Sequence, residues 1–278
     1  MKTVLITGTS SGIGKATARY FSEQGWNVAA TMRNPAKETD LNQLPNVKLF
    51  ALDVMDSASI ARAIVETQAA FGGIDVVVNN AGYGAVGPFE AATDEQIRRQ
   101  FDTNVFGVMN VTREILPYFR ERRNGTIINV TSMGGLITFP IYSIYHGTKW
   151  AVEGFAEALS FELRPFNIRV KNVEPGAIKT DFYDRSQDIL TKPGLTAYDE
   201  YVRVTMENSQ KQGADAPGPI VVAKTIFKAA TDSSFRLRYV TGNALTPTLL
   251  FLRRLLPLSW FHGIVKSVVE KGFKPQVA

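Results

Sequence analysis

The sequence predicts an α/β protein in which helices cover both faces of a doubly wound parallel sheet of about seven strands. Short, continuous apolar runs alternate with helical patterns along the chain. Such runs are typical of strands that are buried on both faces, as they are in a parallel sheet. The first run also leads through a glycine-rich turn directly into a helical pattern, which is the order found in nucleotide-binding α/β proteins.

Each element is placed by its own pattern. Strands are predicted where the apolar runs lie, at residues 2–7, 27–31, 47–51, 76–79, 126–131 and 169–173, with a weaker seventh at 239–241. Helices are predicted where apolar residues recur with helical spacing, at residues 12–24, 57–71, 94–122 and 145–163. Residues 180–219, which include Phe182 and Tyr183, look irregular. A segment of this length is either a lid over a ligand or a surface excursion packed on its own side chains.

Composition limits the classes of function. The 278 residues can bury one large core, so we expect a single domain over residues 1–278. The chain has no cysteine, which excludes disulfides, thiolate metal sites and cysteine nucleophiles, and its 2 histidines are too few for a histidine-ligated metal cluster. The net charge of +5 is spread over helices, so we expect no nucleic-acid partner. The chain opens directly on a strand without a signal peptide, and we expect a cytoplasmic protein.

The carboxyl-terminal tail, residues 247–278, combines apolar bulk with cations. Such a segment closes a substrate pocket, contacts another subunit or lies on a membrane surface. Apolar tails usually pack on their own domain, so we favour the first two alternatives and expect no membrane partner. The long uncharged run from Gly125 to Thr148 is interrupted by Gly134, Gly135 and Pro140, which excludes a membrane-spanning helix there.

A glycine-rich turn follows the first predicted strand. The residues of interest in this turn are Gly8, Ser10, Ser11, Gly12, Ile13 and Gly14. Glycines permit a tight turn and close approach of the backbone to a ligand, and the start of the next helix offers free N–H groups to a pyrophosphate. The spacing Gly-x-x-x-Gly-x-Gly departs from the commoner dinucleotide fingerprint, so a purely structural turn is the alternative at this point.

Three side chains suited to carbonyl–alcohol chemistry lie close together in the sequence. Tyr145 and Lys149 are four residues apart, which places both on one face of the predicted helix. An ammonium beside a phenol, whose free pKa is about 10, makes the tyrosine a usable acid or base. Ser132 follows the strand predicted at 126–131, so its hydroxyl is expected near the start of that helix. A Tyr-x-x-x-Lys pair alone also occurs by chance in many helices.

Taken together and in this order, the motifs resemble the short-chain dehydrogenase/reductase family, and the match covers about the first 180 residues. The matching positions are residues 7–14, Asp53, residues 79–82, Asn104, Ser132, Tyr145, Lys149, Pro175, Gly176 and Thr180. The resemblance implies a Rossmann-like fold and an oxidoreductase in which hydride passes between a nicotinamide and a substrate carbon. It implies no need for a metal.

The resemblance also implies roles for these residues. Tyr145 would exchange a proton with the substrate oxygen, and Ser132 would hydrogen-bond the same oxygen. Lys149 would lower the pKa of the phenol and hold the nicotinamide ribose, while Asn104 would support a water that relays protons to Lys149. Further implied cofactor-binding residues are Asp53, Val54, Asn80, Ala81, Gly82, Tyr145, Pro175, Gly176, Ile178 and Thr180. Plain turn chemistry is the alternative for the Asn-Ala-Gly and Pro-Gly stretches.

The end of the second predicted strand bears on the choice of cofactor. NAD-preferring sites usually place a carboxylate there for the ribose hydroxyls, and that charge repels a 2′-phosphate. Thr31 and Met32 are neutral, and Arg33 supplies a guanidinium that can pair with a phosphate, helped by the Ser11 hydroxyl. The sequence therefore predicts NADP(H), and an exposed arginine at the start of a loop is the alternative.

The substrate is defined only by class. The resemblance reaches the NADP-using branch that contains hydroxysteroid and retinol dehydrogenases, and it implies a small carbonyl or alcohol substrate and a homodimer or homotetramer. Apolar residues near Ser132 suggest a lipophilic substrate pocket lined by Met133, Leu136, Phe139 and Ile141. The main alternative is a non-catalytic dinucleotide-binding sensor or scaffold, which would not need Ser132, Tyr145 and Lys149 together. An enzyme for nucleotide sugars would carry a longer carboxyl-terminal domain.

Overall fold

The centre of the protein is a seven-stranded sheet in which every paired strand runs parallel to its neighbour. The computed structural model describes residues 1–180, 187–213 and 215–274. In spatial order the strands are β3 (Val47–Ala51), β2 (Asn27–Met32), β1 (Thr3–Thr7), β4 (Val76–Asn79), β6 (Gly125–Val130), β7 (Ile168–Pro175) and β9 (Arg238–Thr241). The order reverses between β1 and β4, so the sheet is doubly wound and the predicted Rossmann-like fold is confirmed.

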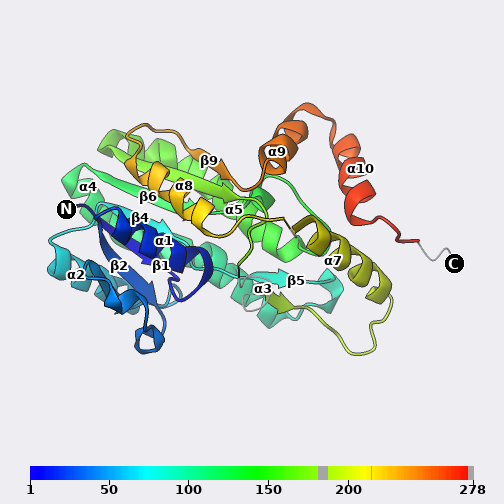
Figure 1. The fold of residues 1–278 in the computed structure, drawn as a ribbon, viewed down its shortest axis with the longest axis horizontal. Coiled ribbons are helices and arrows are strands. Elements are labelled where there is room, and N and C mark those ends of the chain that lie inside the picture. The colour runs from blue at the N-terminus through cyan, green and yellow to red at the C-terminus, as the bar shows by residue number, and fades with distance from the viewer. Residues whose placement is uncertain (181–186, 214, 275–278) are drawn as a thin grey trace.

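Helices cover both faces of this sheet (Figure 1). One face packs on α1 (Gly12–Glu23) and α8 (Ile220–Thr231), which lie side by side. The other face packs on α2 (Ser57–Phe71), α4 (Gly107–Arg122) and α5 (Ser143–Leu163). Because successive strand side chains point to opposite faces, Val4 and Ile6 enter the first layer of core and Leu5 enters the second. Burial on both faces explains why the strands read as continuous apolar runs.

The helix predicted at 94–122 is interrupted by a wider turn. Its residues form α3 (Asp94–Phe101), a π-helical turn (Asp102–Phe106) and α4. The start is fixed by a capping box, in which Thr93 accepts a hydrogen bond from the Gln96 N–H and the Gln96 side chain returns one to the Thr93 N–H. The π turn carries Asn104, and such turns are frequent at functional sites.

The expectation that residues 180–219 are irregular is wrong. This part of the chain contains β8 (Gln187–Ile189), which pairs in parallel with β5 (Gly84–Val86), and the helix α7 (Asp199–Gly213). Strands this short carry too little pattern to detect, and α7 is largely polar, with Val204 and Thr205 as its buried residues among those described. Phe182 and Tyr183, which we expected to line a lid, lie outside the described residues.

The tail forms two helices that pack on the rest of the chain, as expected. They are α9 (Leu245–Leu255) and α10 (Leu258–Val269), drawn in orange and red in Figure 1. Leu250 and Phe261 from these helices join Ile137 in one buried apolar cluster, with Met133 packed against it. None of the helices in the described part of the chain is both long enough and apolar enough to cross a membrane.

We predict that Gly125→Ala destabilises the fold. A Cβ atom at Gly125 would lie 2.3 Å from a ring carbon of Phe119, inside the core between β6 and α4. Overpacking of this kind costs about 1–3 kcal/mol of unfolding free energy. Gly154→Ala is the control, because a Cβ there meets nothing within 4 Å and alanine favours the interior of α5. Urea unfolding measures both variants, and equal stability of the Gly125 variant and the parent would contradict the packing described.

Candidate active site

The glycine-rich turn lies at the carboxyl ends of β1 and β4. Gly8 has a φ of +71°, and a Cβ on it would lie 2.8 Å from the Cα atom of Ala81. A Cβ on Gly14 would lie 2.2 Å from the carbonyl oxygen of Gly8, so α1 begins directly against the turn. The Asn80 Nδ2 atom donates to the carbonyl oxygens of Thr7 at 2.9 Å and Gly8 at 3.0 Å. The structure therefore brings the turn and the predicted residues 80–82 together.

The amino end of α1 completes a surface suited to an anion. Gly12 has a φ of +55°, and Thr180 lies against it, with its Cβ 3.8 Å from the position of a Gly12 Cβ. The Ser11 side chain does not cap α1, and the first turn of the helix carries no acidic residue. Free N–H groups at a helix start bind phosphate, so the turn fits a dinucleotide and Thr180 lies beside it. Ser10 is exposed and Ile13 packs on the adjacent core.

Arg33 is exposed at the end of β2, next to a loop whose carboxylates are already paired. The Lys15 Nζ atom lies 3.1 Å from Glu38 and donates to Asp40 at 2.7 Å. The hydrogen bond to Asp40 raises the pKa of the Lys15 ammonium. Lys15 thus offsets two negative charges that lie close to Arg33 in the sequence. These ion pairs link α1 to the loop after β2. The sequence pattern did not reveal them.

The strand end that carries Asp53 lies beside the π turn region. The Asp53 Oδ1 atom accepts a hydrogen bond from the Met55 N–H at 3.0 Å, which orders the turn before α2. Val54 is buried, and a Cβ on Gly107 would lie 2.7 Å from its side chain. Asp53 itself is half-buried.

The Pro175–Gly176 turn at the end of β7 is tied to the tail. The Gly176 N–H donates to the Thr241 carbonyl oxygen at 2.8 Å. A Cβ on Gly176 would lie 2.1 Å from the Oγ1 atom of Thr246, which is buried near the start of α9. Ile178 is buried in the core below α1 and α8. No pattern in the sequence points to Thr246, because its contact with Gly176 joins segments that are far apart in the chain.

Ser132, Tyr145 and Lys149 come together where β6 meets α5. Ser132 follows β6, and its Oγ atom accepts a hydrogen bond from the Gly134 N–H at 3.0 Å. The Lys149 Nζ atom donates to the Val130 carbonyl oxygen at 3.0 Å and lies 5.6 Å from the centre of the Tyr145 ring. The structure therefore brings Tyr145 and Lys149 together on α5, and it places Ser132 at the start of the loop that packs on the same helix.

Two glycines permit this approach. A Cβ on Gly134 would lie 2.6 Å from the imidazole ring of His146, and a Cβ on Gly135 would lie 3.1 Å from the carbonyl oxygen of Lys149. The loop after Ser132 consequently packs directly on the first turns of α5. Any larger residue would separate the serine hydroxyl from the tyrosine and lysine.

Burial changes the ionisation of Lys149. Removal from water lowers its pKa to about 8, and the nearby Glu153 carboxylate acts in the opposite direction. Lysine with a pKa in this range changes charge close to physiological pH. The charge that Tyr145 experiences therefore depends on groups placed around the ammonium.

Asn104 is buried in the π turn and joins that turn to α5. Its Nδ2 atom donates to the Tyr83 carbonyl oxygen at 2.9 Å and to the Thr148 Oγ1 atom at 3.2 Å. Its Oδ1 atom accepts from the Tyr83 N–H at 3.1 Å. Asn104 thus contacts Thr148, the residue before Lys149 in the chain. It also lies against Gly82, where a Cβ atom would be 3.0 Å from the Asn104 Oδ1 atom.

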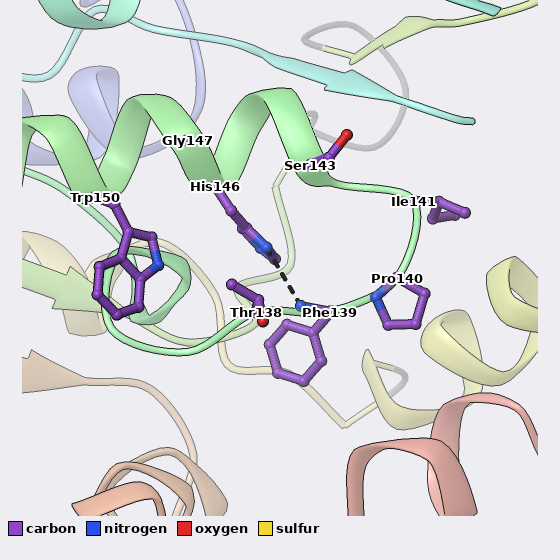
Figure 2. A pocket seen from close by; sticks show the side chains of 8 residues that line it. All are labelled: Thr138, Phe139, Pro140, Ile141, Ser143, His146, Gly147 and Trp150. Atoms are coloured by element: carbon purple, nitrogen blue, oxygen red, sulfur yellow. Dashed lines mark hydrogen bonds between the residues drawn. The ribbon is translucent and has the colours of Figure 1, made fainter. Parts of the chain in front are cut away.

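A cavity of about 490 Å³ opens beside α5 (Figure 2). Its walls are Thr138, Phe139, Pro140, Ile141, Ser143, His146, Gly147 and Trp150. The lining includes none of Ser132, Tyr145 and Lys149, so this cavity does not contain the three candidate residues. The His146 Nδ1 atom accepts from the Phe139 N–H at 3.2 Å, and burial lowers the pKa of this histidine to about 4. A neutral His146 therefore fastens the loop to α5.

The four residues expected to line one apolar pocket are divided between two places. Phe139 and Ile141 line the cavity beside α5. Met133 and Leu136 instead pack against the cluster formed by Ile137 and the tail helices, which Phe139 also contacts. The expectation of a single pocket is therefore wrong, because the tail occupies the space next to Met133.

A sequence model described as short chain dehydrogenase matches residues 2–189. The chain belongs to the short-chain dehydrogenase family. This short-chain dehydrogenase is 38% identical over 276 residues to the uncharacterized oxidoreductase YusZ of Bacillus subtilis, with 96% of this chain and 98% of that protein covered. It is 41% identical over 201 residues to a 3-ketodihydrosphingosine reductase of Bacteroides thetaiotaomicron, with coverage of 72% and 73%. It is 34% identical over 274 residues to retinol dehydrogenase 8 of Bos taurus, with coverage of 92% and 86%.

Solved structures of short-chain dehydrogenases and related enzymes share its fold. A short-chain dehydrogenase from Streptomyces avermitilis matches with a TM-score of 0.80 and 34% identity, over 96% of this chain and 98% of that one. ElxO with NADP bound matches with a TM-score of 0.71 and 28% identity, over 86% and 96%. A 3-oxoacyl-[acyl-carrier protein] reductase from Brucella melitensis with bound NAD matches with a TM-score of 0.68 and 30% identity, over 86% and 89%.

Proposed function

We propose that this short-chain dehydrogenase is an NADP(H)-dependent oxidoreductase that interconverts a carbonyl and a secondary alcohol on a lipophilic substrate. The observation that carries the proposal is the placement of the Lys149 ammonium 5.6 Å from the centre of the Tyr145 ring, with Ser132 at the end of the neighbouring strand. A dinucleotide-binding protein without catalysis needs the glycine turn but has no use for these three side chains in one place.

The nicotinamide cofactor supplies or accepts the hydride when it is bound. In reduction, the Tyr145 hydroxyl gives its proton to the substrate oxygen, and in oxidation the phenolate takes that proton back. Ser132 donates a hydrogen bond to the same oxygen and orients it. The Lys149 cation favours the phenolate and holds the nicotinamide ribose. Asn104 supports proton exchange with solvent from its position beside Thr148.

The proposed cofactor site uses the groups that meet at the carboxyl ends of the strands. The glycine turn fits the pyrophosphate, since glycine alone fits the space left at Gly8 and Gly14. Asp53 and residues 80–82 serve the adenosine half, and Pro175, Gly176, Ile178 and Thr180 serve the nicotinamide half. Related structures hold either NADP or NAD, so the preference for NADP(H) rests on this chain's own Arg33 and on the absence of an acid at Thr31 and Met32.

A lipophilic substrate is supported by the surroundings of Ser132. The next residue, Met133, packs against an apolar cluster built by Ile137, Leu250 and Phe261, so the tail closes one side of the site with hydrocarbon. Two relatives are named for apolar or long-chain substrates, retinol and 3-ketodihydrosphingosine. Apolar walls with few polar groups are typical of pockets that bind such molecules.

Tyr145→Phe tests the catalytic part of the proposal. The change keeps the ring and removes the proton donor, so turnover of a reducible ketone should fall by about 100- to 10,000-fold. NADPH binding, followed by fluorescence titration, should stay within about twofold because the ring remains. Tyr142→Phe is the matched control, since it alters a neighbouring tyrosine outside the motif. A Tyr145 variant that works at the parental rate would remove Tyr145 from the mechanism, whereas a parent that binds NADPH and reduces no ketone would support the binding-protein alternative.

Arg33→Ala tests the choice of cofactor. Loss of a charged hydrogen-bonding partner costs about 1.5–3 kcal/mol, so the Kd for NADPH should rise by roughly 10- to 100-fold while the Kd for NADH changes little. Lys37→Ala removes an exposed cation from the same loop and should have a smaller effect. An intact enzyme with equal catalytic efficiency for NADH and NADPH would remove the NADP(H) assignment and leave the role of Tyr145 untouched.

Phe261→Ala tests the contribution of the tail. Phe261 is buried where α10 meets Ile137, so its truncation should loosen the tail without touching the glycine turn. We expect the KM for a bulky lipophilic ketone to rise about tenfold or more, with the Kd for NADPH unchanged. The exposed neighbour His262→Ala is the control. Unchanged KM values for both large and small ketones would exclude the tail from substrate binding.

A further inference from the structure

Two carboxylates lie buried behind Lys149, at a place that the proposed mechanism does not use. Glu153 belongs to α5 and is 3% exposed, and Glu174 belongs to β7 and is 0% exposed. Burial of a carboxylate is costly unless it is paired and hydrogen-bonded. The contacts around these two groups therefore indicate what holds them there.

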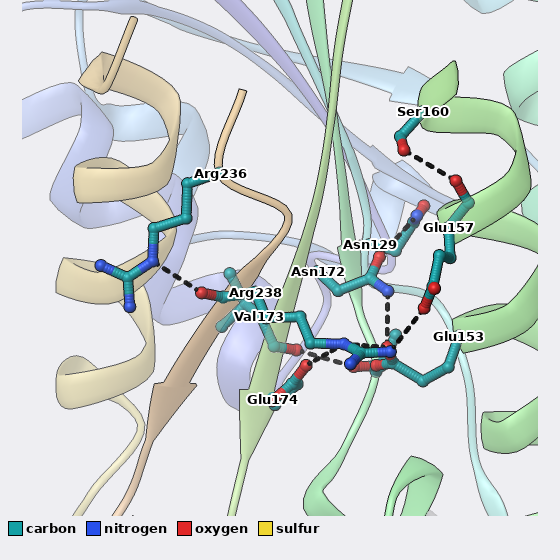
Figure 3. A network of polar contacts seen from close by, with 10 residues as sticks. Asn129, Glu153, Glu157, Ser160, Asn172, Val173, Glu174, Arg236 and Arg238 are labelled. Atoms are coloured by element: carbon teal, nitrogen blue, oxygen red, sulfur yellow. Dashed lines mark hydrogen bonds and ion pairs between the residues drawn. The ribbon is translucent and has the colours of Figure 1, made fainter. Parts of the chain in front are cut away.

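A ladder of asparagine amides crosses the sheet and ends on Glu153 (Figure 3). Asn79, Asn129 and Asn172 are in register on β4, β6 and β7. Asn79 Nδ2 donates to Asn129 Oδ1 at 2.9 Å, and Asn129 Nδ2 donates to Asn172 Oδ1 at 3.1 Å. Asn172 Nδ2 then donates to Glu153 Oε2 at 2.8 Å. Because Asn129 and Asn172 use their oxygens as acceptors, the N–H group of Asn172 at the end of the ladder needs an acceptor, which the carboxylate provides.

Arg238 binds the same carboxylate from β9. Its Nε atom lies 3.3 Å from Glu153 Oε2 and 3.4 Å from Glu174 Oε1, and its Nη2 atom lies 2.9 Å from Glu157 Oε2 (Figure 3). Burial, together with the charge of Glu153, raises the pKa of Glu174 to about 8. Glu174 is consequently mostly uncharged at neutral pH, and Arg238 pairs with Glu153 and the more exposed Glu157.

Glu153 also lies one helical turn from Lys149, on the same side of α5. Its second oxygen, Oε1, is buried and has no hydrogen-bond partner among the described residues. A Cβ on Gly135 would lie 2.8 Å from the Glu153 Cγ atom and 3.1 Å from the Lys149 carbonyl oxygen. The loop after Ser132 therefore covers the turn between Lys149 and Glu153, and little water screens the interaction of the two charges.

We propose that Glu153 is a positioning residue for Lys149: its carboxylate, fixed by the asparagine ladder and Arg238, keeps the buried ammonium charged beside Tyr145. The inference rests on the proposed carbonyl–alcohol chemistry, because it concerns the charge that acts on the Tyr145 phenol. The ladder thus connects the centre of the sheet to the catalytic lysine through a single side chain.

The sign of the effect follows from the charges around Lys149. Tyr145 and Glu153 face it from α5, Glu174 lies beyond Glu153 on β7, and Arg238 lies on β9. Arg236 and Arg254 act on the Glu174 carboxyl from farther away and lower its pKa. Removal of the Glu153 charge favours loss of a proton from both the Lys149 ammonium and the Tyr145 phenol. In a plot of kcat for ketone reduction against pH, the alkaline limb is the fall in rate at high pH. Both changes move this limb to lower pH.

The experiment measures kcat for NADPH-dependent reduction of one ketone between pH 6 and 10. Glu153→Gln keeps the shape and an oxygen for Asn172, and its alkaline limb should lie roughly 0.5–1 pH unit below the parental limb. Near pH 6, where Lys149 is charged in both proteins, the rates should agree within about twofold. Glu157→Gln is the matched control, because it removes the same charge from the same helix and the same arginine, but its side chain is 53% exposed and screened by water. The Glu157 limb should coincide with that of the parent.

Arg238→Gln should not lower the pH of the alkaline limb, unlike Glu153→Gln. The comparison therefore separates an effect of Glu153 on the charge of Lys149 from a general loss of structure. It leaves the Glu153 carboxylate without its cation, so the alkaline limb should stay at the parental pH or move above it. General damage to the fold would lower the rates of both variants across the whole pH range. A Glu153→Gln limb that coincides with the parental limb, or a downward shift in both variants, overturns the inference. Turnover by the parent and its loss in Tyr145→Phe decide the proposed function independently of either result.

Discussion

The close contact between α5 and the loop after β6 is the constraint on which the candidate site depends. Two consecutive glycines allow that loop to lie on the helix backbone, and side chains at Gly134 or Gly135 would meet His146, Glu153 or the Lys149 carbonyl group. The contact brings the loop that begins at Ser132, after the end of β6, against the first turns of α5, which carry Tyr145 and Lys149. It also excludes water from the lysine, so the packing that creates the geometry also sets the ionisation.

Removing the Lys149 ammonium from water costs desolvation free energy, which contacts with the surrounding residues offset. Lys149 loses hydration and gains one carbonyl oxygen, that of Val130, as its hydrogen-bond acceptor on the sheet side. Glu153 supplies the opposite charge, and its own burial is compensated by Asn172 and Arg238. Pairs of buried charges contribute little to stability on balance, because desolvation consumes most of their attraction. The presence of these charges behind Lys149, to which we assign a catalytic role, is therefore better explained by control of charge than by stability.

The sequence predicted the central sheet and the nearness of Tyr145 to Lys149 because both depend on local patterns. Continuous apolar runs follow from burial on both faces, and Tyr145 and Lys149 lie together because four residues make about one helical turn. Other contacts depend on residues that are distant in the chain. Thr246 at the start of α9 packs against Gly176 at the end of β7, and Lys15 on α1 forms an ion pair with Asp40 in the loop after β2. Because the partners are far apart in the chain, neither contact leaves a periodic pattern in the sequence. Short elements such as β5 and β8 were missed because each has three residues, too few to show alternation.

The order of strands in the sheet also has a consequence for how the chain can assemble as it is synthesised. In chain order, β2 and β3 extend the sheet on one side of β1, and β4, β6, β7 and β9 extend it successively on the other side. Each new strand therefore finds a free edge, and none has to be inserted between two strands that are already paired. The nucleotide-binding half can form before β6 and α5 leave the ribosome, and amino-terminal segments generally fold first during translation. Ser132, Tyr145 and Lys149 are thus added after the first four strands of the sheet, and the last strand, β9, brings Arg238 to the buried carboxylate of Glu153.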